Sequence, residues 1–201
     1  MKYAYTSYIL KKGDSNLNDQ LMSLLEQALN GDKKAYVTLI DCIRTDLFRI
    51  AKIKLDNLED ATDAVHETIL KSFIHLNQLR HKEFFKTWII KILINECNNI
   101  YRSNKKQQKI FDILLNHNLI YYKNEIETTD DDLDFDILLK PLNKDEKLVA
   151  ILYYSNHFNT TEIAHILNVN VNTIKSRLLR AKEKIKLENS KGGCEQNETR
   201  K

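Results

Sequence analysis

The chain contains 201 residues, which is enough for one large domain or two small ones. A single proline and only four glycines leave few helix breakers, so we expect a mainly helical protein and exclude a glycine-rich phosphate-binding loop. The formal net charge of +3 is small for a protein that binds nucleic acid over its whole surface, so any such function depends on how the charges are distributed.

Four helices are predicted in the first half of the chain, after a leader over residues 1–18. The pattern of apolar residues places them at 19–31, 32–55, 58–79 and 83–103. The last of these helices is apolar on most of its sides, which is typical of the central helix of a bundle. Together they predict an N-terminal helical domain over 19–104.

Residues 105–140 are predicted to form a linker. One amphipathic stretch, 110–122, is expected as a short helix, and an acidic run without any basic residue follows over 125–136. Runs of this kind are solvated and mobile, so we expect a flexible acidic linker between two small helical domains. The predicted fold class is therefore all-α, and it ends in a polar, disordered tail over 189–201.

A second small domain is predicted over 141–188. Pro141 opens this domain, and either Asn143 or Asp145 can cap its first helix, 145–154. The apolar residues of that helix recur at helical spacing, so it is expected to pack against the helices that follow.

Two short helices joined by a tight turn are predicted over 160–185. Thr160 or Thr161 can cap the first of them. Asn168 can end it, because asparagine tolerates the left-handed backbone conformation of a helix C-terminus. This pattern predicts a helix-turn-helix.

The second of these helices, 172–186, has two different faces. At about 100° per residue, one face is apolar and has to be buried: Ile174, Leu178, Ala181 and Ile185. The opposite face carries Asn172, Ser176, Leu179 and Arg180, and Lys175 and Arg177 flank it. Serine, asparagine and arginine can read base edges, and the flanking lysine and arginine suit phosphates. An amphipathic hairpin with a solvated basic face is the alternative, but the short turn, the cap and the basic excess over 175–191 favour the DNA major groove.

A second group of basic residues surrounds the start of the fourth helix and continues beyond it: Arg80, His81, Lys82, Lys86, Lys91, Arg102, Lys105, Lys106 and Lys109. Phe84, Phe85 and Trp88 lie among them, and this mixture suits single-stranded DNA. The alternative, which is favoured for Trp88 and one phenylalanine, is that the rings belong to the core. The loop 77–82 is therefore the better candidate for contact with an unstacked base.

The sequence contains no pattern that supports catalysis, a cofactor or a metal site. His66 and Glu67 begin a zinc-protease pattern, but Leu70 stands where the second histidine is needed. Asp60, Asp63 and Glu67 share one helix, where they form an acidic metal site, a solvated face or a docking surface for a basic partner. We expect the protein not to be an enzyme.

The three cysteines, Cys42, Cys97 and Cys194, lie too far apart for a metal-binding motif. Cys42 and Cys97 fall in helical patterns, so we expect both to be core thiols. An odd number of cysteines without a disulfide framework fits a reducing cytoplasm. The N-terminal residues lack the apolar stretch of a signal peptide and no run is suited to span a bilayer, so we expect a cytoplasmic protein without membrane insertion.

Three segments, in this order and at this spacing, resemble the extracytoplasmic-function sigma factors. Residues 60–68 (DATDAVHET) look like the helix with which that family binds core RNA polymerase. Residues 85–95 (FKTWIIKILIN) look like its Phe-x-x-Trp helix, and residues 172–181 (NTIKSRLLRA) look like its recognition helix. The resemblance covers roughly 19–103 and 141–187.

The resemblance implies a sigma factor that directs promoter-specific transcription initiation and has no catalysis of its own. Binding of the polymerase β′ clamp is implied for Asp60, Asp63 and Glu67. Melting and holding of the minus-ten element is implied for Asn77, Gln78, Arg80, His81, Lys82, Lys91, Asn95 and Arg102. Reading of the duplex minus-thirty-five element is implied for Asn172, Thr173, Lys175, Ser176, Arg177 and Arg180.

The resemblance also implies contact with the polymerase β flap, a role in stress response, and regulation by an anti-sigma factor that can be membrane-anchored. A free-standing helix-turn-helix regulator with an N-terminal sensor domain is the alternative. It predicts tight operator binding by the chain alone, whereas a sigma factor predicts weak binding alone. A helical interaction protein without DNA is a third hypothesis, which the two basic segments disfavour.

Overall fold

The computed structural model describes residues 15–115 and 137–192. These residues form helices and turns without a β-strand, which confirms the all-α prediction. The chain divides into two compact units, 1–124 and 125–201. The acidic run and most of the predicted leader and tail lie outside the described residues.

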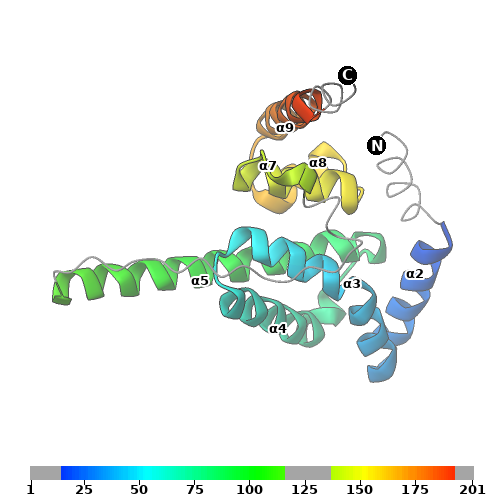
Figure 1. Cartoon of the computed structure of the whole chain (residues 1–201). Coiled ribbons are helices and arrows are strands. Elements are labelled where there is room, and N and C mark those ends of the chain that lie inside the picture. Colours follow the sequence, from blue (N-terminus) through cyan, green and yellow to red (C-terminus); the bar gives the residue numbers. More distant parts are fainter. Residues whose placement is uncertain (1–14, 116–136, 193–201) are drawn as a thin grey trace, which may run out of the picture. The chain divides into compact units, whose positions relative to one another are not determined.

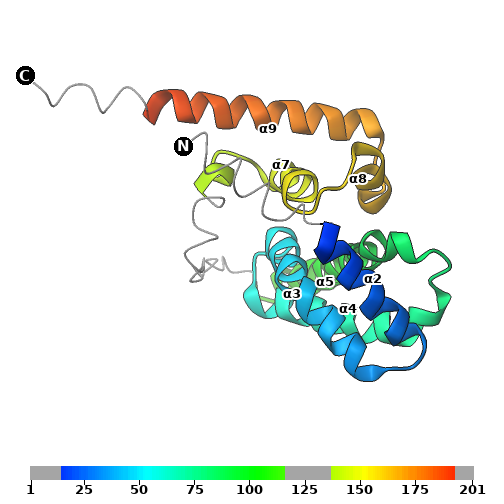
Figure 2. The same cartoon turned by 90° about the vertical axis from the view of Figure 1, so that its right-hand side faces the viewer.

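The described part of the first unit contains four long helices (Figure 1 and Figure 2). They are α2 (Ser15–Leu29), α3 (Lys33–Lys54), α4 (Leu58–His75) and α5 (Phe85–Leu115), with the short 3-10 turns η1 (Leu76–Gln78) and η2 (Lys82–Phe84) between α4 and α5. Helix α5 packs against α3 and α4, but α3 packs against all three other long helices, so α3 and not α5 is the central helix of this unit. The C-terminal half of α5 extends beyond the other helices of this unit (Figure 1).

The turn between α2 and α3 follows from its sequence. Gly31 has a φ of 96°, a left-handed conformation that favours glycine. Asp32 caps α3, because its carboxylate accepts hydrogen bonds from the backbone N–H groups of Lys34 and Ala35 at 2.8 and 3.2 Å. These bonds satisfy donors that the start of a helix leaves open, so α3 begins where the sequence predicts.

Apolar side chains at helical spacing form the core of the first unit. The largest ones that are fully buried are Leu25, Leu39, Leu47, Ile50, Ile89 and Leu93. Each buried side chain of this size contributes about 1.5–3 kcal/mol relative to an exposed one. This seam joins α2, α3 and α5, and it leaves the outer faces of α4 and α5 available for partners.

The second unit contains α7 (Lys144–Ala150), a π-helical turn η3 (Ile151–Ser155), α8 (Thr160–Leu167) and α9 (Val171–Gly192). Helix α9 packs against both α7 and α8. The largest fully buried side chains here are Val149, Ile151, Leu152, Ile163 and Ile174. The prediction of a helix-turn-helix in this unit is confirmed.

Two capping boxes set the helix starts of the second unit. Asn143 caps α7, and its partner Glu146 accepts a hydrogen bond from the Asn143 backbone N–H at 3.1 Å. Asn159 caps α8, and the Glu162 carboxylate accepts a hydrogen bond from the Asn159 backbone N–H at 2.8 Å. The prediction of Thr160 or Thr161 as the α8 cap was therefore wrong, because the box needs its glutamate three residues after the cap.

Four helix boundaries differ from the sequence predictions. Helix α2 begins at Ser15 rather than 19, and α4 ends at His75 rather than 79. Helix α5 continues to Leu115 instead of ending at 103, and α9 continues to Gly192. The sequence of α5 contains no glycine or proline, so the helix continues through the polar residues after Ile100 and includes the first part of the stretch 110–122 that was expected as a separate short helix.

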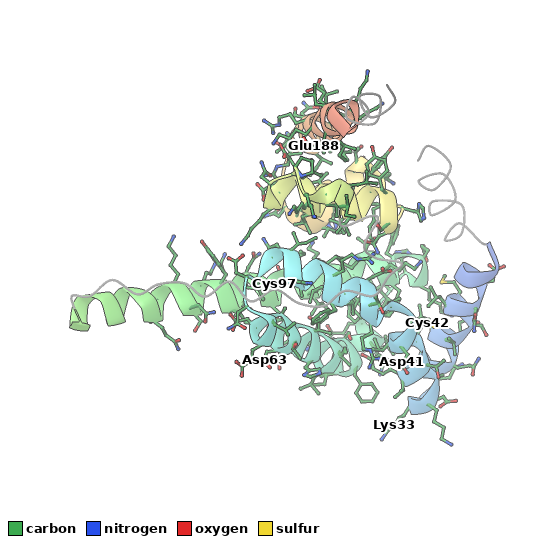
Figure 3. The ribbon with its side chains drawn as sticks, viewed as in Figure 1. Lys33, Asp41, Cys42, Asp63, Cys97 and Glu188 are labelled. Carbon is green, nitrogen blue, oxygen red and sulfur yellow. The ribbon has the colours of Figure 1, made fainter. Side chains whose placement is uncertain are left out.

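The two described cysteines differ in their environment (Figure 3). Cys97 is buried as predicted, and burial raises the pKa of its thiol to about 11. Cys42 is exposed, so the prediction that it is a core thiol was wrong. It lies beside the apolar stripe of α3 that contains Leu39 and Ile43, rather than on it.

Candidate nucleic-acid interface

The turn between α8 and α9 is built by two asparagines. Asn168 adopts a left-handed conformation with φ 53° and ψ 49°, as predicted, and ends α8. Asn170 starts α9, because its side-chain oxygen accepts a hydrogen bond of 2.8 Å from the Asn172 backbone N–H. The backbone oxygen of Asn170 accepts a second bond from the Thr173 N–H at 2.9 Å. The pair of helices is therefore held by local bonds at both sides of the turn.

Helix α9 has the two faces that its sequence predicts. Ile174 and Ala181 are buried, whereas Leu178 and Ile185 are half-buried. The residues predicted for DNA contact are exposed except for two half-buried ones, Thr173 and Arg177: Asn172, Lys175, Ser176 and Arg180 are exposed. The Ser176 hydroxyl donates to the Asn172 carbonyl at 2.8 Å, which leaves its oxygen as an acceptor.

Acidic residues at the start of α7 contact the basic residues of α9. Asp145 pairs with Arg177 at 2.5 Å, and the Arg177 side chain is only 20% exposed. Glu146 pairs with Lys184 at 2.7 Å and faces Arg180 at 4.0 Å. Arg180 itself remains 59% exposed. Of the two arginines predicted to contact DNA, Arg180 is therefore the open one.

Glu146 is a buried carboxylate, with a side chain that is 3% exposed. Burial raises the pKa of this group, but hydrogen bonds from Lys184 and from the Asn143 backbone, with the charges of Lys184 and Arg180, outweigh that effect and lower the pKa. The carboxylate is therefore ionised at neutral pH. This residue was not predicted from the sequence, although the spacing Asn143-x-x-Glu146 is the signature of a capping box.

The loop 77–82 lies between α4 and α5, and its polar residues are exposed: Asn77, Gln78, Arg80, His81 and Lys82. Three of them have side-chain partners. Gln78 lies 3.0 Å from the His75 ring nitrogen, His81 lies 3.3 Å from the Glu83 carboxylate, and Lys82 donates to Glu26 of α2 at 2.9 Å. These contacts join the loop to the end of α4, to η2 and to α2.

Phe84, Phe85 and Trp88 do not share one environment. Phe85 is buried and Trp88 is half-buried, as the core interpretation predicts for one phenylalanine and the tryptophan. Phe84 is 49% exposed, and its ring lies edge-on to the His81 ring at 6.0 Å between centroids. An exposed ring next to a polar loop offers a surface on which a base can stack.

Three further residues predicted for the minus-ten element share one face of α5. Lys91, Asn95 and Arg102 follow the spacing i, i+4 and i+11, which keeps them within about 40° on a helical wheel. Lys91 is half-buried, and Asn95 and Arg102 are exposed. The stripe runs from the loop end of α5 toward its extended half.

The acidic residues predicted to bind polymerase lie on α4. Asp63 and Glu67 are exposed, and Figure 3 shows Asp63 on the outer side of the bundle. Asp60 is half-buried and accepts a hydrogen bond of 2.7 Å from the Asn104 side chain of α5. Glu67 pairs with Lys71 at 3.4 Å. No set of three or more potential ligand residues within the described ranges is arranged to hold a metal ion, so this geometry supports a docking surface or a solvated face.

Two exposed apolar residues continue the acidic stripe and were missed by the sequence analysis. Leu70 is 53% exposed and Ile74 is 61% exposed. With Asp63 and Glu67 they follow the spacing i, i+4, i+7 and i+11 on one face of α4. We call these four residues the α4 stripe. The same wheel could have found them in the sequence, because two large apolar residues in line with two acids are out of place on a solvated face.

None of the helices in the described ranges combines the length and the apolar character that a membrane crossing requires.

Comparisons with known families match both units. The profile described as sigma-70 region 2 matches residues 39–107, and the profile described as sigma-70, region 4 matches residues 138–185. The first match contains α4, the loop 77–82 and the proximal half of α5, and the second contains the helix-turn-helix.

Similar sequences with curated descriptions occur in several bacteria. The RNA polymerase sigma factor SigV of Bacillus subtilis is 30% identical over 159 residues, which cover 79% of this chain and 93% of SigV. The ECF RNA polymerase sigma-E factor of Haemophilus influenzae is 25% identical, over 84% of this chain and 94% of that protein.

Two solved structures share the fold. CnrH, in complex with the cytosolic domain of CnrY, has a TM-score of 0.56 at 18% identity and covers 85% of this chain and 97% of its own. The sigma factor RpoE of Bartonella quintana, in complex with the anti-sigma factor NepR, has a TM-score of 0.58 at 22% identity over 76% of this chain and 94% of its own.

Proposed function

Since this chain belongs to the extracytoplasmic-function sigma factors, we propose that its two helical units divide promoter recognition between them. The protein is a sigma factor that directs transcription initiation by RNA polymerase. The observation that carries the division of roles is the open basic face of α9 in one unit and the loop 77–82 with its exposed ring in the other.

The first unit binds core polymerase through α4 in this proposal. Asp63 and Glu67 supply acceptors for a basic partner, and Leu70 and Ile74 supply an apolar surface that becomes buried in the complex. Such a mixture of charge and exposed apolar side chains is typical of an interaction site. The β′ clamp is the part of polymerase that we assign to this stripe, with Asp60 at its edge.

The minus-ten element binds to the loop 77–82 and along α5. A base that stacks on the exposed ring of Phe84 lies next to His81 of the loop, whose ring centroid is 6.0 Å from that of Phe84, and can hydrogen-bond the polar groups of the loop. Arg80, Lys82 and Arg102 attract the phosphates of the melted strand, and Asn95 adds a neutral donor and acceptor on the same face of α5.

The minus-thirty-five element binds to α9 as duplex. Asn172, Ser176 and Arg180 present base-reading groups on the exposed face, and Lys175 contacts phosphate. Thr173 and Arg177 are half-buried, so they support the helix start and its orientation more than they contact bases. We also assign to the second unit a contact with the β flap.

Further parts of the proposal concern chemistry, location and regulation. The protein has no catalysis of its own, because the polymerase performs the chemistry, and it acts in the cytoplasm, where that polymerase works. We assign it an anti-sigma partner, since RpoE forms a complex with the anti-sigma factor NepR and CnrH forms one with the cytosolic domain of CnrY.

The proposal is tested with the purified chain and core polymerase on a promoter library rich in A·T pairs. Specific transcripts are expected from promoters that share two short elements at a fixed spacing. Absence of polymerase binding and of transcripts would contradict the proposal. Operator binding by the chain alone, with no effect of polymerase, would favour the free-standing regulator instead.

A further inference from the structure

Glu146 connects α7 with the base-reading face of α9. Its Oε2 accepts hydrogen bonds from Lys184 Nζ at 2.7 Å and from the Asn143 backbone N–H at 3.1 Å. Its other oxygen, Oε1, faces Arg180 Nε at 4.0 Å. The two oxygens therefore face different cations of α9. Oε2 faces Lys184, nearer the C-terminus of the helix, and Oε1 faces Arg180 on its exposed face.

Because Glu146 approaches only the Nε atom of Arg180, the two terminal amino groups of the guanidinium are left available for binding a ligand. An arginine side chain has five N–H donors in a planar fork, and only one of them is on Nε. The pair of terminal amino groups is the part that binds the O6 and N7 atoms of guanine with two parallel hydrogen bonds. The Arg180 side chain is 59% exposed, so these amino groups remain accessible to a ligand.

Resting on the proposed reading of duplex DNA by α9, we propose that Glu146 is the positioning residue for Arg180 and that the pair selects a guanine in the minus-thirty-five element. At 4.0 Å the buried carboxylate forms an ion pair with the Nε edge of the guanidinium rather than a hydrogen bond, and this attraction favours one orientation of the side chain before DNA arrives. Immobilising a long side chain in advance removes about 0.5–1.5 kcal/mol from the cost of binding, which is about a two- to tenfold gain at that base.

Other contacts hold α7 and α9 together. Asp145 and Arg177 connect α7 with α9 at 2.5 Å, and Lys184 satisfies the Oε2 atom of Glu146. The contact between Oε1 and Arg180 adds little to packing, because Arg180 is largely exposed. Its effect should therefore appear in base preference rather than in stability.

The test measures base preference at each position of the upstream element. Holoenzyme made from core polymerase and the full chain transcribes a promoter library that is randomised over that element. The unmodified chain, Glu146→Gln, Arg180→Ala and the double variant are compared. We expect Glu146→Gln to lower the preference for guanine about two- to tenfold at the one position that Arg180→Ala abolishes, and to have no further effect in the double variant.

Lys184→Gln is the matched control, because it removes the other cation of the Glu146 carboxylate and keeps the contact with Arg180. It should leave the guanine preference unchanged. Glu146→Asp keeps the charge but shortens the side chain by one methylene group, which moves the carboxylate away from Arg180. It should therefore lower the guanine preference partially at the same position. Thermal unfolding of each variant checks that the second unit is folded. If Glu146→Gln does not fold, the comparison is made with Glu146→Asp instead.

Three results would overturn the inference. One is an equal loss of preference at all positions in Glu146→Gln, which would indicate a structural role. Another is a further loss when Glu146→Gln is added to Arg180→Ala, since the two residues would then act independently. The third is the absence of any base preference upstream with the unmodified chain, which would also overturn the proposed function, whereas the first two leave it intact.

Discussion

The side-chain amide of Asn104, on α5, donates a hydrogen bond of 2.7 Å to the carboxylate of Asp60, on α4. Asp60 is one of the acidic residues of α4 that we assign to polymerase, whereas Asn104 lies on the side of α5 that faces away from Lys91 and Arg102. The hydrogen bond therefore occupies one carboxylate oxygen of the proposed polymerase-binding surface in the free protein.

Breaking this bond should favour polymerase binding slightly. Asn104→Ala frees the Asp60 carboxylate, so we expect an affinity for core polymerase that is equal or up to about fivefold higher, which corresponds to about 1 kcal/mol for one exposed hydrogen bond. Titration of the fluorescently labelled chain with core polymerase measures this affinity. Asn99→Ala, at another exposed position of α5, is the control, and a loss of affinity in Asn104→Ala would contradict the assignment of Asp60.

The α4 stripe should be essential for polymerase binding and dispensable for folding. We expect Asp63→Lys and Ile74→Asp each to weaken polymerase binding at least tenfold, since one reverses the charge and the other removes an apolar contact in the complex. The free energy of unfolding should change by no more than about 0.5 kcal/mol, because both residues are exposed.

Asp41→Lys is the matched control for this stripe. Asp41 is an exposed acid of the same unit, but it lies on α3 and pairs with Arg44 at 3.9 Å (Figure 3). The same charge reversal there should leave polymerase binding unchanged. Equal losses in Asp41→Lys and Asp63→Lys would show that overall charge, rather than the α4 stripe, controls binding.

The adjacent residues Phe84 and Phe85 should have opposite effects. Phe84→Ala removes an exposed ring, so we expect it to weaken promoter opening by about 1–3 kcal/mol while stability is nearly unchanged. Phe85→Ala removes a buried ring and should cost about 3–5 kcal/mol of stability. Fluorescence of 2-aminopurine in the minus-ten element reports opening. Normal opening with Phe84→Ala would remove the ring from the proposed site.

The pH dependence of stability should depend on Glu146. Its pKa is lowered in the folded protein by Lys184, Asn143 and Arg180, which outweigh the effect of burial. A lowered pKa means that the stabilisation is complete above the unfolded pKa of about 4.3 and is lost as the pH falls through the folded value. At pH 7 we expect Glu146→Gln to cost about 1–3 kcal/mol, because the partners of a buried group lose a charge-assisted bond.

Thermal unfolding from pH 7 to pH 3 checks this expectation. The difference between the unmodified chain and Glu146→Gln should be constant near neutral pH and should shrink below about pH 4. Asp145→Asn, which changes an acid that is 60% exposed on the same helical turn, should differ by no more than about 1 kcal/mol. A difference that stays constant down to pH 3 would show that the Glu146 carboxylate is not the group responsible.

Local patterns in the sequence were sufficient for the helices and for the turn between α8 and α9. The left-handed Asn168 and the apolar face of α9 depend on neighbouring residues, so they could be predicted. The cap of α8 is also visible in the sequence, because Asn159 and Glu162 have the spacing of a capping box. The end of α5 was placed too early, because the polar run 102–109 interrupts the apolar pattern without containing a residue that ends a helix.

Contacts between distant residues could not be predicted in this way. Arg177 and Asp145 are 32 residues apart, and Lys184 and Glu146 are 38 residues apart. A helical wheel places Arg177 beside the exposed face, but only the packing of α9 on α7 shows that Asp145 covers it. The α4 stripe is different, since its spacing is visible in the sequence and only the exposure of Leu70 and Ile74 had to come from the structure.

The central claim is that this chain reads promoters as a subunit of polymerase and not as a free regulator. Binding of a labelled promoter duplex, selected from the transcribed library, tests it most directly when measured with the chain alone and with the chain plus core polymerase. We expect weak, nonspecific binding by the chain alone and specific binding that appears only with polymerase and is reduced by Arg180→Ala. Tight, sequence-specific binding by the chain alone, unchanged by polymerase, would contradict the claim.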